Sequence, residues 1–282
     1  MLLVTSCPAG CGAGFRESDI AMPEGPLLVC TACGHLVSQI EETDYLAALA
    51  KFDTHAGTLP SQLSQKRHDQ RARRLFARVR ELLGLNPGSS FHLLDVGCSS
   101  EALLLSAVKE GIEAEGVEPA MRAAETARAA GLTVFAGMLH EARYPAERFQ
   151  AVTMMEVIEH LRQPIDVVKE IWNILAPGGI LVIGTGNADS WTVSIMRERW
   201  DYFHMERYGG HISFFTPRSL ERLAGRCGFR IERLETKRVR FAESFQASHV
   251  VYRTLKIVAE VLNVPAMWCH KGHDMPAFLR KV

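Results

Sequence analysis

The chain has no excess of charge of either sign, because 32 basic and 32 acidic side chains cancel within its 282 residues. It also lacks long apolar runs, since charged residues interrupt each run well before the roughly 18 residues that a membrane helix needs. The first residues show neither the basic start nor the small-residue cleavage site of a signal peptide. We therefore expect a cytoplasmic protein without a membrane partner, and nucleic acid as a partner only through a local basic patch.

Cysteine is sparse except near the N-terminus, where four of the seven cysteines fall in two close pairs. Cys7 and Cys11 form the first pair, and Cys30 and Cys33 form the second. In a reducing compartment such pairs favour metal binding over disulfide bonds. Four thiolates complete a tetrahedral site, so the pattern predicts a structural zinc ion rather than a catalytic one.

The order of apolar runs and helical patterns indicates an alternating α/β fold. An amphipathic helix is expected over residues 61–84, followed by a breaker at residues 86–88. Strands are then predicted over 91–96, 114–117, 132–135, 149–155 and 180–184, separated by helices over 101–110, 120–130 and 164–175. Strands that are apolar along their whole length and alternate with helices predict a doubly wound parallel sheet that is buried on both faces.

The same reading divides the chain into four parts. Residues 1–43 are a zinc-ribbon-like module, 44–88 a helical connector, 89–240 a Rossmann-like domain and 241–282 a C-terminal helical extension. An irregular, aromatic insertion over residues 187–215 follows the fifth strand of the domain. We expect it at the carboxyl edge of the sheet, where ligands bind in such folds. It could form a lid over a bound substrate, a satellite hydrophobic core or a dimer surface.

Two motifs predict a nucleotide-like cofactor at this edge. A buried strand ends in Asp95-Val96-Gly97 and opens into a helix, so that small residues let the backbone approach a ligand. The next strand ends in Glu118, about twenty residues further on, where a carboxylate can accept hydrogen bonds from both ribose hydroxyls.

Several motifs, in order, resemble those of class I S-adenosylmethionine-dependent methyltransferases over residues 75–235. Leu94–Cys98 is similar to their first motif, Gly116–Pro119 to the ribose-binding motif, and Met154–Leu161 to the fourth strand and its exit. Leu175–Gly179 is similar to the turn before the fifth strand, and His211–Gly228 to a stretch of one large subfamily.

The resemblance implies a Rossmann-like methyltransferase sheet and S-adenosylmethionine as the cofactor. The cofactor-binding residues that it implies are Asp95, Gly97, Cys98, Ser99, Glu101, Glu118, Pro119, Gly137, Met138, Leu139, Met155 and Glu156. Ser99 and Glu101 stand where these enzymes have glycine. The Glu101 carboxylate would repel the cofactor carboxylate, or would turn outward as an acid in the first helical turn. A catalytically impaired protein is therefore one alternative.

Methyl transfer from a sulfonium needs an aligned acceptor and, where that acceptor carries a proton, a group that removes it. The candidates for catalysis are His160, His211 and Glu159, although His160 can equally be a structural histidine. Glu156, Glu159 and His160, joined by His211, could also hold Mg²⁺ or another divalent ion against an acceptor hydroxyl.

The leading interpretation is methylation of oxygen or carbon on a small-molecule or natural-product acceptor. The alternative is an RNA methyltransferase that holds RNA with the zinc module and the basic helix over residues 61–84. The basic side chains of that helix are Lys66, Arg67, Arg71, Arg73, Arg74, Arg78 and Arg80. The sequence leaves the acceptor and the oligomeric state open.

Overall fold

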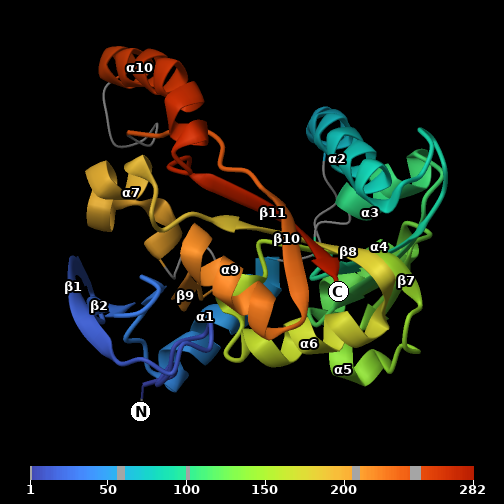
Figure 1. Cartoon of the computed structure of the whole chain (residues 1–282), viewed down its shortest axis with the longest axis horizontal. Helices are drawn as coiled ribbons and strands as arrows, with labels where there is room; N and C mark the ends of the chain where they lie inside the picture. The colour runs from blue at the N-terminus through green and yellow to red at the C-terminus, as the bar shows by residue number, and fades with distance from the viewer. Residues whose placement is uncertain (1, 56–60, 100–101, 205–209, 242–248) are drawn as a thin grey trace.

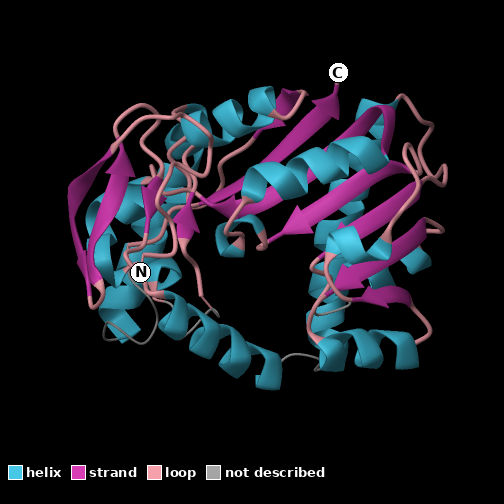
Figure 2. Cartoon of the chain, turned by 90° about the horizontal axis from the view of Figure 1, so that it is seen from below, coloured by secondary structure: helices cyan, strands magenta, loops and turns pink. Residues whose placement is uncertain are grey.

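The computed structural model describes residues 2–55, 61–99, 102–204, 210–241 and 249–282 (Figure 1). Within these ranges the strands form a seven-stranded sheet and a four-stranded sheet. Figure 2 shows the small sheet beside the N-terminus and the large sheet on the other side of the molecule, with helices packed along it. No helix in these ranges combines the length and the apolar character needed to cross a membrane.

The large sheet has the strand order β10-β11-β8-β7-β4-β5-β6. Five strands pair in parallel: β4 (His92–Val96), β5 (Glu113–Glu118), β6 (Thr133–Ala136), β7 (Phe149–Met155) and β8 (Leu175–Gly186). Two strands at one side pair antiparallel: β10 (Phe229–Leu234) and β11 (Asp274–Lys281). The predicted parallel strands are confirmed, and the sheet as a whole is mixed.

Helices cover both faces of this sheet because its strands are apolar on both sides. Leu93 packs into a core with Phe76 and Val79, whereas the next residue, Leu94, packs into a second core with Ile171 and Leu220. The helices that carry these cores are α2 (Gln62–Leu83) on one face, and α6 (Pro164–Ile174) and α9 (Pro217–Arg226) on the other. The remaining helices that flank the sheet are α3 (Ala102–Lys109), α4 (Met121–Ala129) and α5 (Leu139–Ala142).

The ends of α2 confirm the predicted helix over residues 61–84. Ser61 caps the start by accepting a hydrogen bond from the Ser64 backbone N–H at 3.2 Å. Gly84 ends the helix in the left-handed conformation, at φ 70°. The chain reaches α2 from α1 (Glu42–His55), which follows the N-terminal module.

The N-terminal module shares its sheet with the aromatic insertion. Its strands β1 (Phe15–Met22), β2 (Gly25–Cys30) and β3 (Leu36–Val37) are followed in the sheet by β9 (Ser213–Phe214), which lies in the insertion. The pairing sets Leu36 opposite Phe214 and Val37 opposite Ser213. The insertion also contains α7 (Trp191–Met196) and the short 3₁₀ helices η2 (Arg197–Arg199) and η3 (Asp201–Phe203).

The C-terminal segment is helical only in its first part, which corrects the expectation of a helical extension over residues 241–282. After α10 (His249–Trp268) the chain returns as β11 and inserts between β8 and β10. Met275, Ala277 and Leu279 are fully buried there. This strand completes the apolar face of the sheet, so it belongs to the central core.

We expect Leu279→Ala to lower the free energy of unfolding by about 2–5 kcal/mol, because it leaves a cavity where Leu279 faces Leu181 and Ile231 across the sheet. Urea denaturation followed by circular dichroism measures this change. Val282→Ala is the matched control, since Val282 is 72% exposed and its truncation should leave the midpoint unchanged. Equal midpoints for the two variants would contradict a core role for β11.

Candidate active site

The turn after β4 requires glycine at position 97. Gly97 has a φ of 74°, and its N–H donates to the Val117 carbonyl at 2.8 Å. A Cβ atom at this position would lie 2.4 Å from Cγ2 of Val157, which follows β7. The turn is therefore packed tightly between the ends of β5 and β7, at the edge where the sequence predicts the cofactor.

Asp95 is buried at the end of β4. Its Oδ1 accepts a hydrogen bond from Thr153 Oγ1 on β7 at 2.7 Å. Burial, and to a lesser degree the nearby Glu118 carboxylate, raise the pKa of Asp95 to about 7, while the Thr153 hydrogen bond opposes the shift. A cationic group nearby would favour its ionised form.

Glu118 is held in place at the end of β5. Its Oε1 accepts a hydrogen bond from the Ala120 N–H at 2.8 Å, across Pro119, and its backbone carbonyl accepts one from the Gly137 N–H at 3.0 Å. A carboxylate fixed in this way suits a ribose diol, so the residues present fit the cofactor that the sequence predicts.

The other predicted cofactor residues differ in exposure. Cys98 is buried, and its thiol packs against Gly116 rather than outward. Met138 is exposed after β6, whereas Leu139 is buried beside it. Ser99 follows β4, Met155 is the last residue of β7 and Glu156 follows it, all at the same sheet edge. Glu101 lies outside the described residues.

Glu159 joins the exit of β7 to the insertion. It is fully buried in the 3₁₀ helix η1 (Ile158–His160). Its Oε2 accepts a hydrogen bond from Thr185 Oγ1 at 2.9 Å, and its Oε1 accepts one from the hydroxyl of Tyr202. Its backbone carbonyl accepts a bond from the Ile212 N–H at 3.0 Å. The carboxylate therefore connects β8 and η3 to the strand exit.

His160 and His211 lie side by side, with ring centroids 4.6 Å apart. His211 is buried, and its Nδ1 lies 2.8 Å from the Tyr202 carbonyl, which can only accept, so Nδ1 carries the proton and Nε2 a lone pair. Burial, and next the neighbouring His160, lower the pKa of His211 to about 3 despite the backbone hydrogen bond. The ring is thus neutral at physiological pH.

Glu156 is an exposed residue beside this cluster, in a left-handed backbone conformation at φ 56°. Desolvation by the surrounding protein and then the Glu159 carboxylate raise the pKa of Glu156 to about 9. One ligand atom from each of Glu159, His160 and His211 lies within 4.8 Å of the others. The structure therefore brings together three of the four residues of the predicted divalent site.

The four N-terminal cysteines also converge. One Sγ atom from each of Cys7, Cys11, Cys30 and Cys33 lies within 4.8 Å of the others, and Cys7 Sγ and Cys33 Sγ are 3.6 Å apart. Zn–S bonds of about 2.3 Å in a tetrahedron place sulfur atoms roughly 3.8 Å apart. Gly34, at φ 72°, turns the chain so that its N–H donates to the Cys30 carbonyl. This donor set fits zinc.

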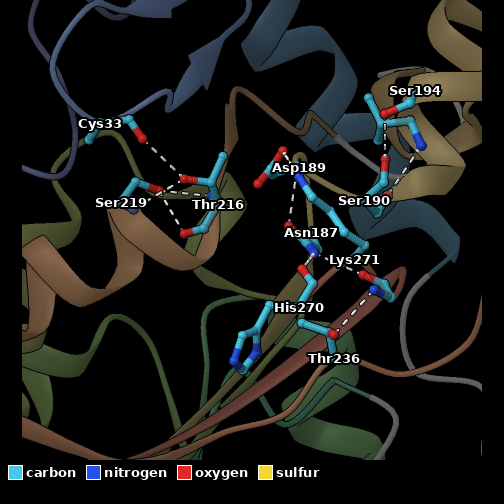
Figure 3. A network of polar contacts seen from close by, with 12 residues as sticks. Cys33, Asn187, Asp189, Ser190, Ser194, Thr216, Ser219, Thr236, His270 and Lys271 are labelled. Carbon is cyan, nitrogen blue, oxygen red and sulfur yellow. Dashed lines mark hydrogen bonds and ion pairs between the residues drawn. The ribbon is translucent and has the colours of Figure 1, made fainter. Parts of the chain in front are cut away.

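Contacts run from this cysteine cluster to the start of α9. The Cys33 carbonyl accepts a hydrogen bond from Thr216 Oγ1 at 3.2 Å, and Thr216 also caps α9 together with Ser219 (Figure 3). His35 lies within hydrogen-bond distance of Ser213 Oγ, at 2.8 Å, and of Ser219 Oγ, at 3.3 Å. Burial lowers the pKa of His35 to about 3, which keeps it neutral.

The module also reaches the histidine pair directly. The Ser38 N–H donates to the Ile212 carbonyl at 3.0 Å, next to His211. The hydroxyl of Tyr45, on helix α1 directly after the module, donates to the His160 carbonyl at 2.9 Å. The N-terminal module and α1 therefore both contact the backbone beside the catalytic candidates.

A second polar network ties the insertion to the C-terminal segment. Asn187 donates from its side chain to the carbonyls of His270 and Gly272, at 3.0 and 2.8 Å, and Thr236 accepts from the Gly272 N–H (Figure 3). These bonds fix the start of the insertion where β8 ends and β11 begins.

Sequence reasoning missed Thr185, Tyr202 and Tyr45, which hold Glu159 and His160. Tyr202 is one of seven aromatic residues in the insertion, and nothing in the local sequence distinguishes it from the others. Thr185 comes one residue after the strand predicted over 180–184, and a single hydroxyl there gives no sign of its partner.

The sheet is parallel from β6 to β8 and antiparallel only through β11 and β10. It has a glycine turn after β4 and a fixed carboxylate at the end of β5. Together these features define an S-adenosylmethionine-dependent methyltransferase of class I. A family model described as a methyltransferase domain, Methyltransf_23, matches residues 67–234. The chain belongs to this family.

Curated relatives and solved structures agree with this class. The chain is 30% identical to the ubiquinone biosynthesis O-methyltransferases of Cereibacter sphaeroides, over 53% of this chain and 64% of that protein, and of Psychrobacter arcticus, over 49% and 58%. It therefore spans less than two thirds of the length of either relative. A methyltransferase structure from Archaeoglobus fulgidus matches with a TM-score of 0.51 at 20% identity, over 74% of this chain and 94% of that one. One from Methanosarcina mazei matches with 0.52 at 15%, over 74% and 97%.

We expect Asp95→Asn to remove a pH dependence of stability. The folded pKa of Asp95, about 7, lies above its unfolded value, so its contribution is fully present below about pH 4 and is lost as the pH rises through 7. The variant should match the wild type near pH 4 and exceed it at pH 8, by up to about 4 kcal/mol. Urea denaturation at both pH values, without cofactor, measures this difference.

Glu125→Gln, at an exposed carboxylate on α4, is the matched control and should follow the wild type. An Asp95→Asn variant that loses stability between pH 5 and pH 8 as steeply as the wild type would show that Asp95 does not titrate in this range.

Proposed function

We propose that this methyltransferase transfers a methyl group to a hydroxyl oxygen of a small-molecule acceptor. The observation that carries the proposal is the cluster of Glu159, His160 and His211, which follows directly from the strand exit at the cofactor edge. A hydroxyl must lose its proton during methylation, and this cluster offers lone pairs and negative charge where that proton would leave. The curated relatives named above are O-methyltransferases, which favours oxygen over carbon.

When bound, S-adenosylmethionine would supply a methyl group on a positively charged sulfur, which is open to in-line displacement. Glu118 would hold the ribose hydroxyls, and Asp95 would lie near the methionine end. His160 and Glu156 line the solvent side of the cluster and are the groups placed to meet the acceptor. His211 and Glu159 are buried behind them, where they orient the site.

We further propose that the cluster holds a divalent cation through Glu159, His160 and His211, with Glu156 at its open side. His211 is too weakly basic, at a pKa of about 3, to be an effective proton acceptor, but a neutral imidazole is a good metal ligand. Two imidazoles with one carboxylate suit Fe²⁺ better than Mg²⁺. Such an ion would lower the pKa of a bound acceptor hydroxyl.

The N-terminal module is proposed to hold a structural zinc ion and to build the acceptor side of the site. Its contacts with Ser213 and Thr216 support this role, as does the bond from Tyr45, on the helix that follows the module, to the His160 carbonyl. Four adjacent thiols that must stay reduced also suit a cytoplasmic location.

The structure offers less support for RNA as the acceptor. Arg73 pairs with Glu110 at 2.8 Å, Arg78 pairs with Glu81, and Arg80 is buried and donates to the Ser89 carbonyl. In Figure 1, α2 also lies on the opposite side of the molecule from β1 and β2. The basic helix and the zinc module therefore do not form one surface, and a small molecule is the acceptor we propose.

We expect purified protein to methylate small hydroxyl-bearing acceptors. The value of kcat/KM should fall at least about 100-fold for His211→Gln or after chelation, and after chelation it should recover when Fe²⁺ is returned. Calorimetric titration should show unchanged S-adenosylmethionine affinity in His211→Gln and weakened affinity in Glu118→Ala. Glu101→Gly serves as a comparison, since binding by that variant alone would identify an inactivated relative. Full activity in the presence of a chelator would reject the divalent site, and turnover of RNA alone would reject the small-molecule acceptor.

Protein purified without a chelator should contain one equivalent of zinc by elemental analysis, and Cys30→Ser should lose it. That variant should also lose acceptor turnover while keeping its S-adenosylmethionine affinity, because the cofactor motifs lie on β4 and β5. Cys269→Ser, at an exposed cysteine outside the cluster, is the control and should keep both zinc and turnover. Substoichiometric zinc in the wild type would contradict the zinc site.

A further inference from the structure

Gln65 is a buried polar residue near the start of α2, with only 8% of its surface exposed. Helix α2 packs against α3, and the two helices lie side by side in Figure 1. The side-chain Nε2 of Gln65 lies 3.1 Å from the carbonyl oxygen of Ala102, which is the first residue of α3. Because α3 follows the glycine turn after β4, this contact places Gln65 at the cofactor edge of the sheet.

The contacts of Gln65 fix which way its amide faces. Nε2 donates to Asp69 Oδ1 at 2.8 Å and to the Ala102 carbonyl at 3.1 Å. A carboxylate and a carbonyl can only accept, so the amide oxygen cannot take the place of Nε2. The Ser106 hydroxyl lies within donating distance of the same two oxygens, at 2.7 and 2.8 Å, so its hydrogen is already used.

The amide oxygen of Gln65 is left without a donor. Oε1 is buried, and no donor among the residues that the structure describes forms a hydrogen bond with it. A buried carbonyl oxygen without a donor is costly and rare in folded proteins. The bond from Nε2 to the Asp69 carboxylate also polarises the amide and makes Oε1 a stronger acceptor. This position is therefore suited to a donor from outside the chain, and best to a positively charged one.

Ion pairs further along the two helices hold Gln65 in place. Asp69 pairs with Lys109 on α3 at 2.9 Å, and Arg73 pairs with Glu110 at 2.8 Å. The order of these contacts shows that α2 and α3 run in the same direction, with both starting at the cofactor edge. A side chain that is already fixed by its neighbours loses little further freedom when a ligand binds, which favours affinity.

We propose that Oε1 of Gln65 binds the α-ammonium group of S-adenosylmethionine. This group, at the methionine end of the cofactor, offers several N–H donors and a positive charge. Glu118 on β5 is expected to hold the ribose, and the predicted cofactor residues 137–139 follow β6, so the methionine end is the part that lies beside β4 and α3. This role of Gln65 depends on S-adenosylmethionine as the cofactor and is independent of the acceptor and the divalent cation proposed above.

Calorimetric titration with two ligands tests this role. S-adenosylhomocysteine carries the α-ammonium group, and the second ligand is its analogue with hydrogen in place of the amino group. The wild type should bind S-adenosylhomocysteine about 10- to 100-fold more tightly than the analogue, which is the range for a hydrogen bond to a charged group. Gln65→Met keeps the length of the side chain without its amide. It should lose most of this preference through weaker binding of S-adenosylhomocysteine, and should bind the analogue with wild-type affinity.

Gln70→Met is the matched control, because Gln70 is an exposed glutamine on the same helix and this variant should bind both ligands like the wild type. A Gln65→Met variant that weakens both ligands equally would reduce Gln65 to packing between α2 and α3 and overturn the proposal. Wild-type binding of both ligands by that variant would assign Oε1 to a buried water and overturn it as well. Equal affinity of the wild type for the two ligands would overturn it without any variant, even where Gln65→Met fails to fold.

Discussion

The hydrogen bonding of the buried Glu159 carboxylate is the interaction on which the structure around the exit of β7 depends. It lies at the exit of β7, accepts hydrogen bonds from Thr185 on β8 and Tyr202 in the insertion, and is followed by His160. A buried carboxylate is costly unless donors compensate for the lost water. The two hydroxyl donors meet that requirement only when the insertion folds back over the sheet. The carboxylate therefore selects the conformation of the insertion as well as contributing to the site.

The N-terminal module stabilises the same conformation from the other side. Strand β9 is only two residues long and pairs with β3, itself two residues long. Strands this short are not stable as an isolated ladder. Thr216 and His35 supply additional bonds between the module and α9, and the hydroxyl of Tyr45, on the helix that follows the module, donates to the His160 carbonyl. The module and the insertion are thus best understood as one structural unit.

The cofactor side was predictable from the sequence because its signals are local. The glycine after β4, the carboxylate after β5 and the paired cysteines each lie within a few residues of the backbone feature they need. The pairing of Leu36 with Phe214 could not be predicted, since two-residue strands have no periodicity to detect. Strand β11 was missed for a related reason: Pro276 in its middle argues against a central strand.

The way in which Pro276 is tolerated explains how β11 can lie inside the sheet. Its carbonyl still accepts a bond from the Glu235 N–H at 3.0 Å, so only the missing N–H weakens the ladder. Met275, Ala277 and Leu279 offset that loss through their complete burial. Tertiary packing here outweighs the preference of proline against central strands. The local sequence pattern does not report this packing.

The distribution of charge at Glu159 and the neighbouring Glu156 follows from the same need for donors that compensate a buried carboxylate. Glu159 has its hydroxyl donors, so its charge is accommodated in the interior. Glu156 lies next to it at the open side, where both desolvation and the Glu159 charge raise its pKa. The tendency to hold a proton or a cation is therefore strongest at Glu156, the exposed residue beside the cluster. The most perturbed carboxyl, Glu156, is therefore exposed, and the buried Glu159 with its hydroxyl donors lies behind it as a rigid support. Group transfer requires charged groups held in place by such a support.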